Sequence, residues 1–302
     1  MVKNLVLENI SVGFKLPQGV FYAVDDVSLS LPGGNFTAII GESGCGKSVL
    51  GQAILNILPS GVIKKGRVLY NGEHVKKILS AFGIIPQNPS ESLNPVRKIG
   101  KQMQDILDVH NIADSSNSYK KQCLRLFGLQ EAERVLAAYP HELSGGMLQR
   151  VLCAMAVSSK PECILADEPT KGLDEQVGAV VRKNLLTIKQ DLHLSMLIIT
   201  HDIALAQEVC DDVLVMYAGQ VLEHNADIWH KPLHPYTKGF LQALPKNGLQ
   251  VIPGKAPVPG ESFTGCKFAA RCPYCTTRCK EEKPAMQQVG NAEVRCFLYA
   301  EG

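Results

Sequence analysis

The sequence lacks a hydrophobic run long enough to cross a membrane. Its apolar stretches all fall short of the roughly 18 consecutive residues that a spanning helix requires. The amino terminus, MVKNLVLENI, contains a glutamate and has no extended apolar core, so it does not resemble a secretory signal. We therefore expect a cytosolic protein without a membrane-spanning segment of its own.

The sequence also lacks a marked net charge, internal repeats and low-complexity tracts. Its 31 basic and 29 acidic residues leave a formal charge of +2. Proteins that bind nucleic acid through their surface charge usually show a clear excess of basic residues, so no nucleic-acid partner is expected. A length of 302 residues with 45% hydrophobic content suits one large domain with an appendage, or two smaller domains.

Short apolar segments alternate with helical segments over much of the chain. Near the amino terminus, LVLENISVGF and AVDDVSLSL predict antiparallel strands separated by turns. FTAII, CILA, SMLIIT and DVLVMY predict further strands, and the helical segments between them indicate a mostly parallel sheet. The region from about 88 to 160 is predicted to be helical. The predicted fold class is therefore α/β, with an antiparallel β part at the amino terminus.

A glycine-rich turn lies between the predicted strand FTAII and the helical segment that follows it. Its sequence, GESGCGKS, fits the phosphate-loop pattern GxxxxGK(S/T). Such glycines let backbone N–H groups turn toward an anion, and the start of the helix adds partial positive charge. The lysine would reach the β- and γ-phosphates of a nucleoside triphosphate, and the serine hydroxyl would bind Mg²⁺. The predicted nucleotide-binding residues are Gly41, Glu42, Ser43, Gly44, Cys45, Gly46, Lys47 and Ser48.

Polar side chains follow three other predicted strands. Asp167 and Glu168 end CILADE, His201 follows SMLIIT, and Gln87 follows the short apolar segment GII. Ligands of open α/β sheets bind at the carboxyl ends of the strands, where these groups are expected to meet. Asp167 and Gln87 would join Ser48 in binding Mg²⁺. Glu168 would act as general base on the attacking water, with His201 and Gln87 as further catalytic residues.

A second anion-binding surface is predicted in the segment HELSGGMLQR. Ser144 can cap a helix whose first turn contains Gly145 and Gly146, which leaves bare amides at a positive helix end. Leu143–Met147, LSGGM, resembles the LSGGQ signature of ABC (ATP-binding cassette) ATPases, with Met147 in place of glutamine. The phosphate loop, Gln87, CILADE, Asp174 in a D-loop and His201 as switch histidine match that family in order.

The ABC resemblance implies a P-loop NTPase fold and an ATP-hydrolysing enzyme that pairs head to tail with a second nucleotide-binding domain. The signature Leu143, Ser144, Gly145, Gly146 and Met147 would then serve the nucleotide of the partner. Phe14 would stack on adenine, although Phe21 and Tyr22 are also available. The D-loop departs from the usual pattern at Lys171 and Gly172, which suggests two unequal ATP sites in a heterodimer.

A closer resemblance spans nearly the whole chain. QNPSESLNP, YPHELSGGMLQR, VMYAGQVLE, HPYTKGFLQALP and GCKFAARCP are similar to ATPase subunits of oligopeptide, dipeptide and nickel importers. The family implies a paralogous ATPase or a second copy as partner, two membrane permeases that dock around residues 75–100, and an extracytoplasmic solute-binding protein. It also implies a location at the cytoplasmic face of the cell (inner) membrane. The solute, peptide or nickel, stays open. The alternative is a non-transport ABC ATPase acting on nucleic acid or the ribosome, but its typical insertions and basic arms are absent.

Five of the ten cysteines lie in the last 37 residues. We divide the chain into a nucleotide-binding domain (1–244, with a helical subdomain at about 88–160) and an extension (245–302) that begins with a Pro- and Gly-rich linker. Paired spacing such as CPYC suits a thiolate-bound metal, either Zn²⁺ or an iron–sulfur cluster, more than disulfides in a reducing compartment, and free thiols are the remaining alternative. The importer resemblance favours a 4Fe-4S cluster on Cys266, Cys272, Cys279 and Cys296, with Cys275 as the extra thiol.

Overall fold

The computed structural model describes residues 4–17, 19–74, 81–244, 248, 250–258, 261 and 263–300. The strands are β1 (Leu5–Leu16), β2 (Gly19–Leu31), β3 (Phe36–Ile40), β4 (Ile63–Tyr70), β5 (Glu73–His74), β6 (Phe82–Ile85), β7 (Cys163–Asp167), β8 (Ser195–Ile199), β9 (Asp212–Tyr217), β10 (Gln220–Asn225), β11 (Gln287–Val289) and β12 (Ala292–Val294). The α-helices are α1 (Lys47–Ile54), α2 (Pro89–Ser92), α3 (Ile99–Val109), α4 (Asn117–Leu126), α5 (Ala132–Ala137), α6 (Gly145–Ser158), α7 (Glu175–Thr187), α8 (Ile203–Val209), α9 (Pro235–Gln242) and α10 (Thr277–Glu281). Among the described residues, no helix is both long and apolar enough to cross a bilayer.

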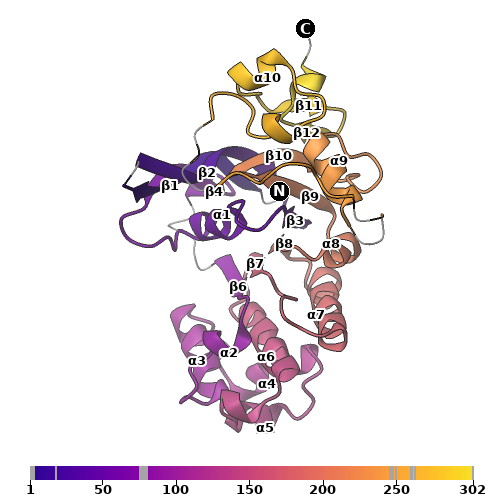
Figure 1. Cartoon of the computed structure of the whole chain (residues 1–302). Coiled ribbons are helices and arrows are strands. Elements are labelled where there is room, and N and C mark those ends of the chain that lie inside the picture. Colours follow the sequence, from indigo (N-terminus) through magenta and orange to yellow (C-terminus); the bar gives the residue numbers. More distant parts are fainter. Residues whose placement is uncertain are drawn as a thin grey trace.

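The main sheet occupies the centre of the molecule. Within the described residues it has eight strands, in the order β11-β12-β10-β9-β3-β8-β7-β6 (Figure 1). The strands from β9 to β6 in that order run parallel, and β10, β12 and β11 continue antiparallel at the other end. Strands β3 and β9 are buried along their whole length, as expected for parallel strands covered on both faces. The predicted α/β class with a mostly parallel core is confirmed.

The parallel strands place the loops that follow them at one edge of the sheet. The register pairs Ile39 with Ile199 and Asp167 with Ile199, so the carboxyl ends of β3, β7 and β8 are level. The pairing of Ile85 with Ala166 brings the end of β6 to the same edge. The phosphate loop and the polar residues predicted to join it therefore lie within reach of one another.

A second sheet is formed by the amino-terminal strands, in the order β2-β1-β4-β5 within the described residues. Strand β1 pairs antiparallel with both β2 and β4, which confirms the predicted antiparallel part. The register shifts after Leu7, where Asn9 adopts a φ of +50° and donates from Nδ2 to Asp26 Oδ1 at 3.0 Å. Residues 75–80, which belong to the segment predicted to dock on a permease, lie outside the described residues.

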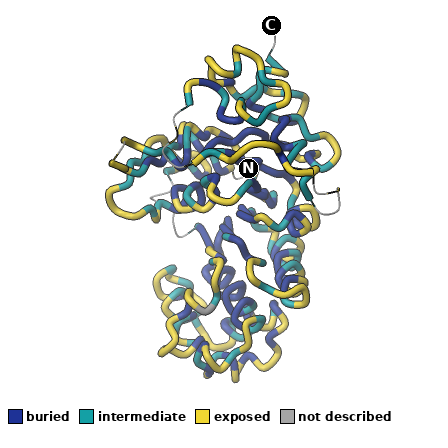
Figure 2. Tube along the Cα trace, viewed as in Figure 1, coloured by how far each residue is buried: buried dark blue, intermediate teal, exposed yellow. Residues whose placement is uncertain are grey.

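Helices α2 to α6 form a separate lobe below the sheets (Figure 1). Helix α3 buries Ile99, Met103 and Leu107, which recur every four residues on one face. Helix α6 is buried along most of its length and continues the apolar core of the lobe up to the sheet (Figure 2). Helix α4 follows α3 after a short break and begins at a cap, where Ser116 Oγ accepts from the Tyr119 N–H at 3.2 Å.

The carboxyl-terminal extension lies at the end of the main sheet opposite the helical lobe, at the top of the view in Figure 1. Strand β12 pairs with β10 through Glu223–Val294 and His224–Glu293, so part of the extension belongs to the sheet. We did not predict this pairing, because strands of three residues are too short to show a periodic pattern. Ile252, in the predicted linker, is only 8% exposed and packs in one apolar core with residues of β3, β9 and α9 and with Phe268 of the extension. The rest of the linker falls partly outside the described residues, and the domain division stays a prediction.

Candidate functional site

The phosphate loop connects β3 to α1 and is shaped by two close backbone contacts. Gly41 has a φ of +150°, and a Cβ there would lie 2.2 Å from the Met216 carbonyl oxygen. Gly46 has a φ of +105°, and a Cβ there would lie 2.1 Å from the Ala23 carbonyl oxygen. No side chain fits at either position, so both glycines are required for the loop to pass this close to neighbouring strands.

Lys47 begins α1 and is buried under the loop. Its Nζ donates to the Gly41 carbonyl oxygen at 2.9 Å and to the Glu42 carbonyl oxygen at 3.1 Å. The next residue, Ser48, donates from Oγ to Asp167 Oδ1 at 3.2 Å. The loop amides, the lysine and the start of α1 together form a concave surface suited to a polyphosphate.

The end of β7 holds two adjacent carboxylates in different surroundings. Burial raises the pKa of Asp167 and the neighbouring Glu168 raises it further, although the hydrogen bond from Ser48 opposes both. Glu168 is 8% exposed, and its Oε2 lies 2.6 Å from His201 Nδ1. Its φ of +48° is in the left-handed region, a conformation that a residue other than glycine adopts at some cost in free energy. This backbone turn directs the Glu168 side chain into the cavity beside the phosphate loop.

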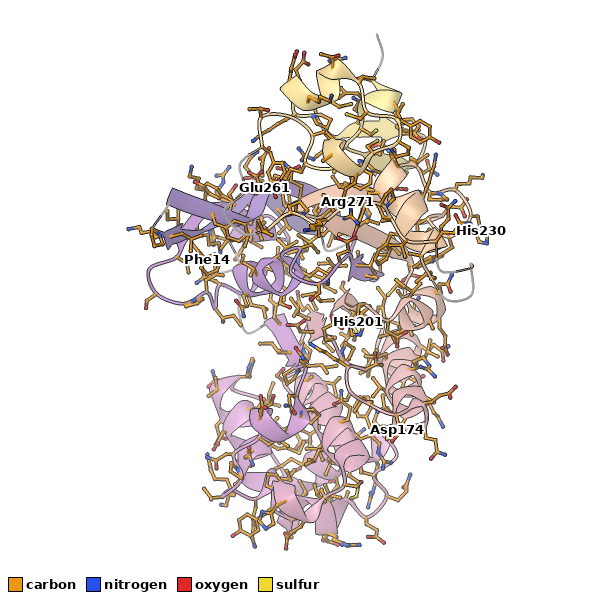
Figure 3. All side chains as sticks on the ribbon, in the orientation of Figure 1. Phe14, Asp174, His201, His230, Glu261 and Arg271 are labelled. Carbon is orange, nitrogen blue, oxygen red and sulfur yellow. The ribbon has the colours of Figure 1, made fainter. Side chains whose placement is uncertain are left out.

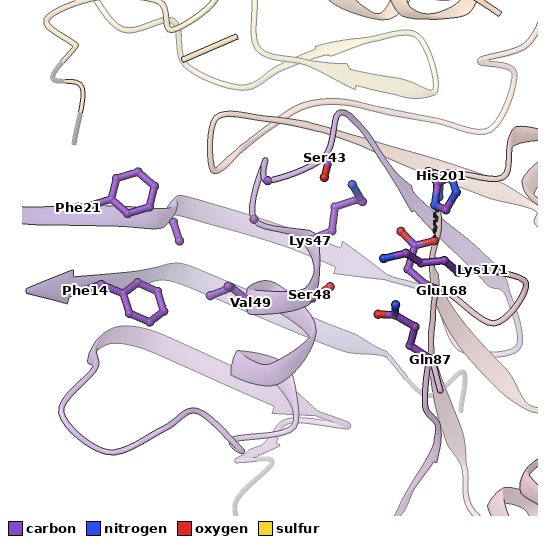
Figure 4. Close-up of a pocket in the computed structure, with 13 residues that line it drawn as sticks. Phe14, Phe21, Ser43, Lys47, Ser48, Val49, Gln87, Glu168, Lys171 and His201 are labelled. Carbon is purple, nitrogen blue, oxygen red and sulfur yellow. Dashed lines mark hydrogen bonds and ion pairs between the residues drawn. The ribbon is translucent and has the colours of Figure 1, made fainter. Parts of the chain in front are cut away.

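One cavity of about 580 Å³ joins these groups (Figure 4). Phe14 and Phe21, which pair across β1 and β2, lie at one end, and Gln87, Glu168 and His201 lie at the other. A cavity of this size suits a nucleotide-sized ligand. Its described lining is Phe14, Phe21, Ala23, Ser43, Gly44, Gly46, Lys47, Ser48, Val49, Gln87, Glu168, Lys171 and His201.

The structure brings together most of the residues predicted for this chain's own nucleotide. Tyr22 does not line the cavity and lies instead under the Lys65 ammonium, 5.6 Å from the ring centre. Ala23, Val49 and Lys171 line the cavity and were not predicted to. Lys171 was noticed only as a departure in the D-loop, yet its backbone N–H donates to the Glu168 carbonyl oxygen at 3.0 Å. Its position three residues after Glu168 is the signal that could have found it.

The signature residues lie away from this cavity. Ser144 caps α6, accepting from the Met147 N–H at 3.4 Å, and both Ser144 and Gly145 are exposed. Asp174 caps α7 in the same way, accepting from the Val177 N–H at 2.9 Å, and Figure 3 shows it well below His201. None of Leu143–Met147 is among the described residues that line the cavity, so a ligand confined to that cavity would not contact the signature of its own chain.

Four of the five cysteines in the extension line one small cavity of about 170 Å³: Cys266, Cys272, Cys279 and Cys296. Cys275 does not line it. Burial raises the pKa of Cys266 to about 11, and the three other thiols add to the shift. All ten cysteines are free. Across the part of the chain that the structure describes, His, Cys, Asp and Glu side chains form no group of three or more arranged to hold a metal ion.

Two family models match the chain. One, described as ABC transporter, matches residues 24–171. The other, described as the carboxyl-terminal region of oligopeptide/dipeptide transporters, matches residues 222–279.

Individual relatives match over almost the whole length. The chain is 36% identical to the dipeptide transport ATP-binding protein DppD of Escherichia coli K12, over 95% of this chain and 94% of that protein. It is 34% identical to the oligopeptide transport ATP-binding protein OppD of Haemophilus influenzae, over 98% of both chains. Among solved structures, the ATP-binding cassette MJ0796, in a dimeric post-hydrolysis state with ADP and Pi, gives a TM-score of 0.62 at 26% identity, over 73% of this chain and 97% of that chain.

Proposed function

This chain belongs to the family of ATP-binding subunits of oligopeptide and dipeptide ABC transporters, and from that membership we propose that it hydrolyses ATP to drive the import of peptides. One observation carries the proposal: a single cavity joins the phosphate loop to Glu168, His201 and Gln87. The names of the relatives support peptides as the solute and give no support to nickel or to a role on nucleic acid or the ribosome.

The polyphosphate of ATP would lie on the amides of the phosphate loop, with Lys47 beside its β- and γ-phosphates. The adenine would lie at the far end of the cavity, where Phe14 and Phe21 present aromatic faces. Ser48, Asp167 and Gln87 carry the hard oxygen donors that Mg²⁺ prefers, and Ser48 and Asp167 already lie within hydrogen-bonding distance. Bound there, Mg²⁺ would neutralise charge on the phosphates.

Hydrolysis requires a water molecule to attack the γ-phosphorus while the bond to the β-phosphate oxygen breaks. Glu168 would accept a proton from that water as the new P–O bond forms, giving ADP and inorganic phosphate. His201, held by Glu168 at 2.6 Å, would contact the γ-phosphate and keep the carboxylate directed toward the water. Burial of Glu168 limits the number of orientations its side chain can adopt.

Two such chains would complete each other's sites. The amides of Ser144–Gly146, a segment in which Ser144 and Gly145 are exposed, would bind the ATP of a partner subunit, and Asp174 would lie near the same interface. We propose a paralogous ATPase as that partner, two permeases that this pair moves, an extracytoplasmic peptide-binding protein, and a location at the cytoplasmic face of the cell membrane. The D-loop departs from the usual family pattern at Lys171 and Gly172, and on this ground we propose that the two ATP sites differ.

We further propose that Cys266, Cys272, Cys279 and Cys296 bind a 4Fe-4S cluster that holds the extension together. Their shared cavity, which Cys275 does not line, supports this ligand set. Because these thiols are not arranged as ligands in the described residues, binding would complete the local fold. Anaerobically purified protein should contain iron and sulfide in equal amounts, lose both in Cys272→Ser, and keep both in Cys275→Ser. Zinc in place of iron, or iron lost equally in both variants, would contradict the assignment.

The proposed function is tested by purifying the chain with its membrane partners. The complex should hydrolyse ATP faster in the presence of the peptide-loaded binding protein, and Lys47→Ala should abolish the activity. Stimulation by a nickel chelate but not by peptides, or purification with nucleic acid in place of permeases, would refute it.

A further inference from the structure

Glu42, the second residue of the phosphate loop, is held from two sides. Its carbonyl oxygen accepts from Lys47 Nζ at 3.1 Å, within the loop itself. Its backbone N–H donates to Tyr236 Oη at 3.1 Å, and both of its carboxylate oxygens lie 3.1 Å from Arg271 Nη1. Tyr236 and Arg271 both come from the carboxyl-terminal part of the chain, and Arg271 lies in the extension. The extension is therefore in direct contact with the nucleotide-binding loop.

Arg271 lies at the junction of the extension and the main sheet, where its side chain is buried and has several partners (Figure 3). Its side chain is 7% exposed, whereas that of Glu42 is 27% exposed. Its Nε donates to the Pro253 carbonyl oxygen at 3.1 Å, and its guanidinium lies 5.7 Å from the ring centre of Tyr217. A buried guanidinium with this many partners has little freedom to leave Glu42.

The extension is attached to the nucleotide-binding part by two further basic residues. Lys267 Nζ lies 2.8 Å from Asp25 Oδ2 and donates to the Ala218 carbonyl oxygen at 2.8 Å. Arg295 donates to the carbonyl oxygens of Asp26 and Val221 at 3.2 and 3.3 Å.

Each of these three basic residues is adjacent in sequence to a cysteine of the small cavity: Cys266 with Lys267, Arg271 with Cys272, and Arg295 with Cys296. The segments that line the small cysteine cavity therefore also carry the three basic residues that contact the nucleotide-binding part.

We propose that Arg271 is a positioning residue for ATP, which keeps the phosphate loop ready to bind the polyphosphate by holding and neutralising Glu42. Without Arg271, the Glu42 carboxylate would be left unpaired on the loop that binds the polyphosphate, and its negative charge would oppose that binding. Neither Arg271 nor Glu42 lines the nucleotide cavity, so Arg271 acts through the charge and position of Glu42 in the loop and not by contact with ATP. The inference rests on the proposed assignment of the phosphate loop as the ATP site.

The test is a mutant cycle read out by ATP affinity in the full-length chain and by KM and kcat in the assembled transporter. Arg271→Gln should raise Kd and KM for ATP about five- to tenfold and leave kcat nearly unchanged. This loss of affinity lies between the effect of removing an exposed ion pair and that of breaking a buried one. Arg271→Lys should recover part of the affinity. In a Glu42→Gln background, Arg271→Gln should have little further effect, because no carboxylate remains to be neutralised.

Lys280→Gln is the control, since Lys280 is an exposed basic residue of α10 in the same extension and lines neither the nucleotide cavity nor the cysteine cavity. The proposal is overturned if Arg271→Gln binds ATP as Lys280→Gln does, or if its loss of affinity is equally large in the Glu42→Gln background. The latter result would mean that Arg271 acts by supporting the fold alone. Lys47→Ala separates the two assignments: if it binds ATP normally, the site assignment itself fails.

Discussion

The most informative single substitution is Glu168→Gln, because it removes the proposed base and keeps the shape of the side chain. Glu168 is 8% exposed and its Oε2 lies 2.6 Å from His201 Nδ1, an interaction that the glutamine oxygen can retain as an acceptor. What is lost is the ability to take a proton from the attacking water. General-base catalysis contributes about 10²- to 10⁴-fold, so the activation barrier should rise by ~3–5 kcal/mol.

ATP binding should be preserved or become tighter in Glu168→Gln. Glu168 contributes to the raised pKa of Asp167, after the larger effect of burial, which indicates repulsion between the two carboxylates. Removing one negative charge next to the γ-phosphate position relieves such repulsion, so a closed dimer with bound ATP should accumulate. Turnover measured by phosphate release and binding measured by equilibrium titration separate the two effects. Glu131→Gln, an exposed carboxylate in the helical lobe, is the control. Near-normal turnover in Glu168→Gln would refute the base assignment.

Three further substitutions test other parts of the account. Gly46→Ala should abolish nucleotide binding and destabilise the chain by at least about 2 kcal/mol in chemical denaturation, because the new Cβ would lie 2.1 Å from the Ala23 carbonyl oxygen; normal ATP binding would contradict this. Ser144→Tyr should leave ATP binding to the isolated chain unchanged and block hydrolysis in the assembled pair. Full activity in the pair would contradict the assignment of the signature residues to the partner's ATP site. Burial lowers the pKa of His224, but the carboxylates of Asp212 and Glu293 outweigh burial and raise it above 6.5. The stabilisation by His224 is therefore complete below about pH 6.5 and is lost as pH rises through the raised value. The wild-type Tm should exceed that of His224→Gln by more at about pH 6 than at about pH 9, and an equal difference would contradict the ion pair.

The parts of the site that could be predicted from the sequence are those set by local patterns. Three apolar strands are followed by polar residues, and parallel pairing alone brings Gln87, Glu168 and His201 to the edge where the phosphate loop lies. The antiparallel amino-terminal strands follow from alternation and turn residues in the same way. These features depend on neighbours in the sequence or on a general rule of sheet topology.

The parts that could not be predicted depend on contacts between distant segments. Arg271 and Glu42 are 229 positions apart, and no periodicity links them. The choice among Phe14, Phe21 and Tyr22 depends on how β1 and β2 turn relative to the loop; the structure places the first two at the cavity. Strand β12 is too short to be recognised before its partner β10 is known. In each case tertiary packing, and not local preference, determines the outcome.

The central claim, that ATP hydrolysis by this chain drives peptide import, is tested most directly in proteoliposomes that contain the chain and its permeases. Uptake of a labelled peptide delivered by the binding protein should require Mg-ATP on the side where this chain resides, and should fall to background with Glu168→Gln. Peptide uptake that continues at the wild-type rate with Glu168→Gln, or without ATP, would contradict the account.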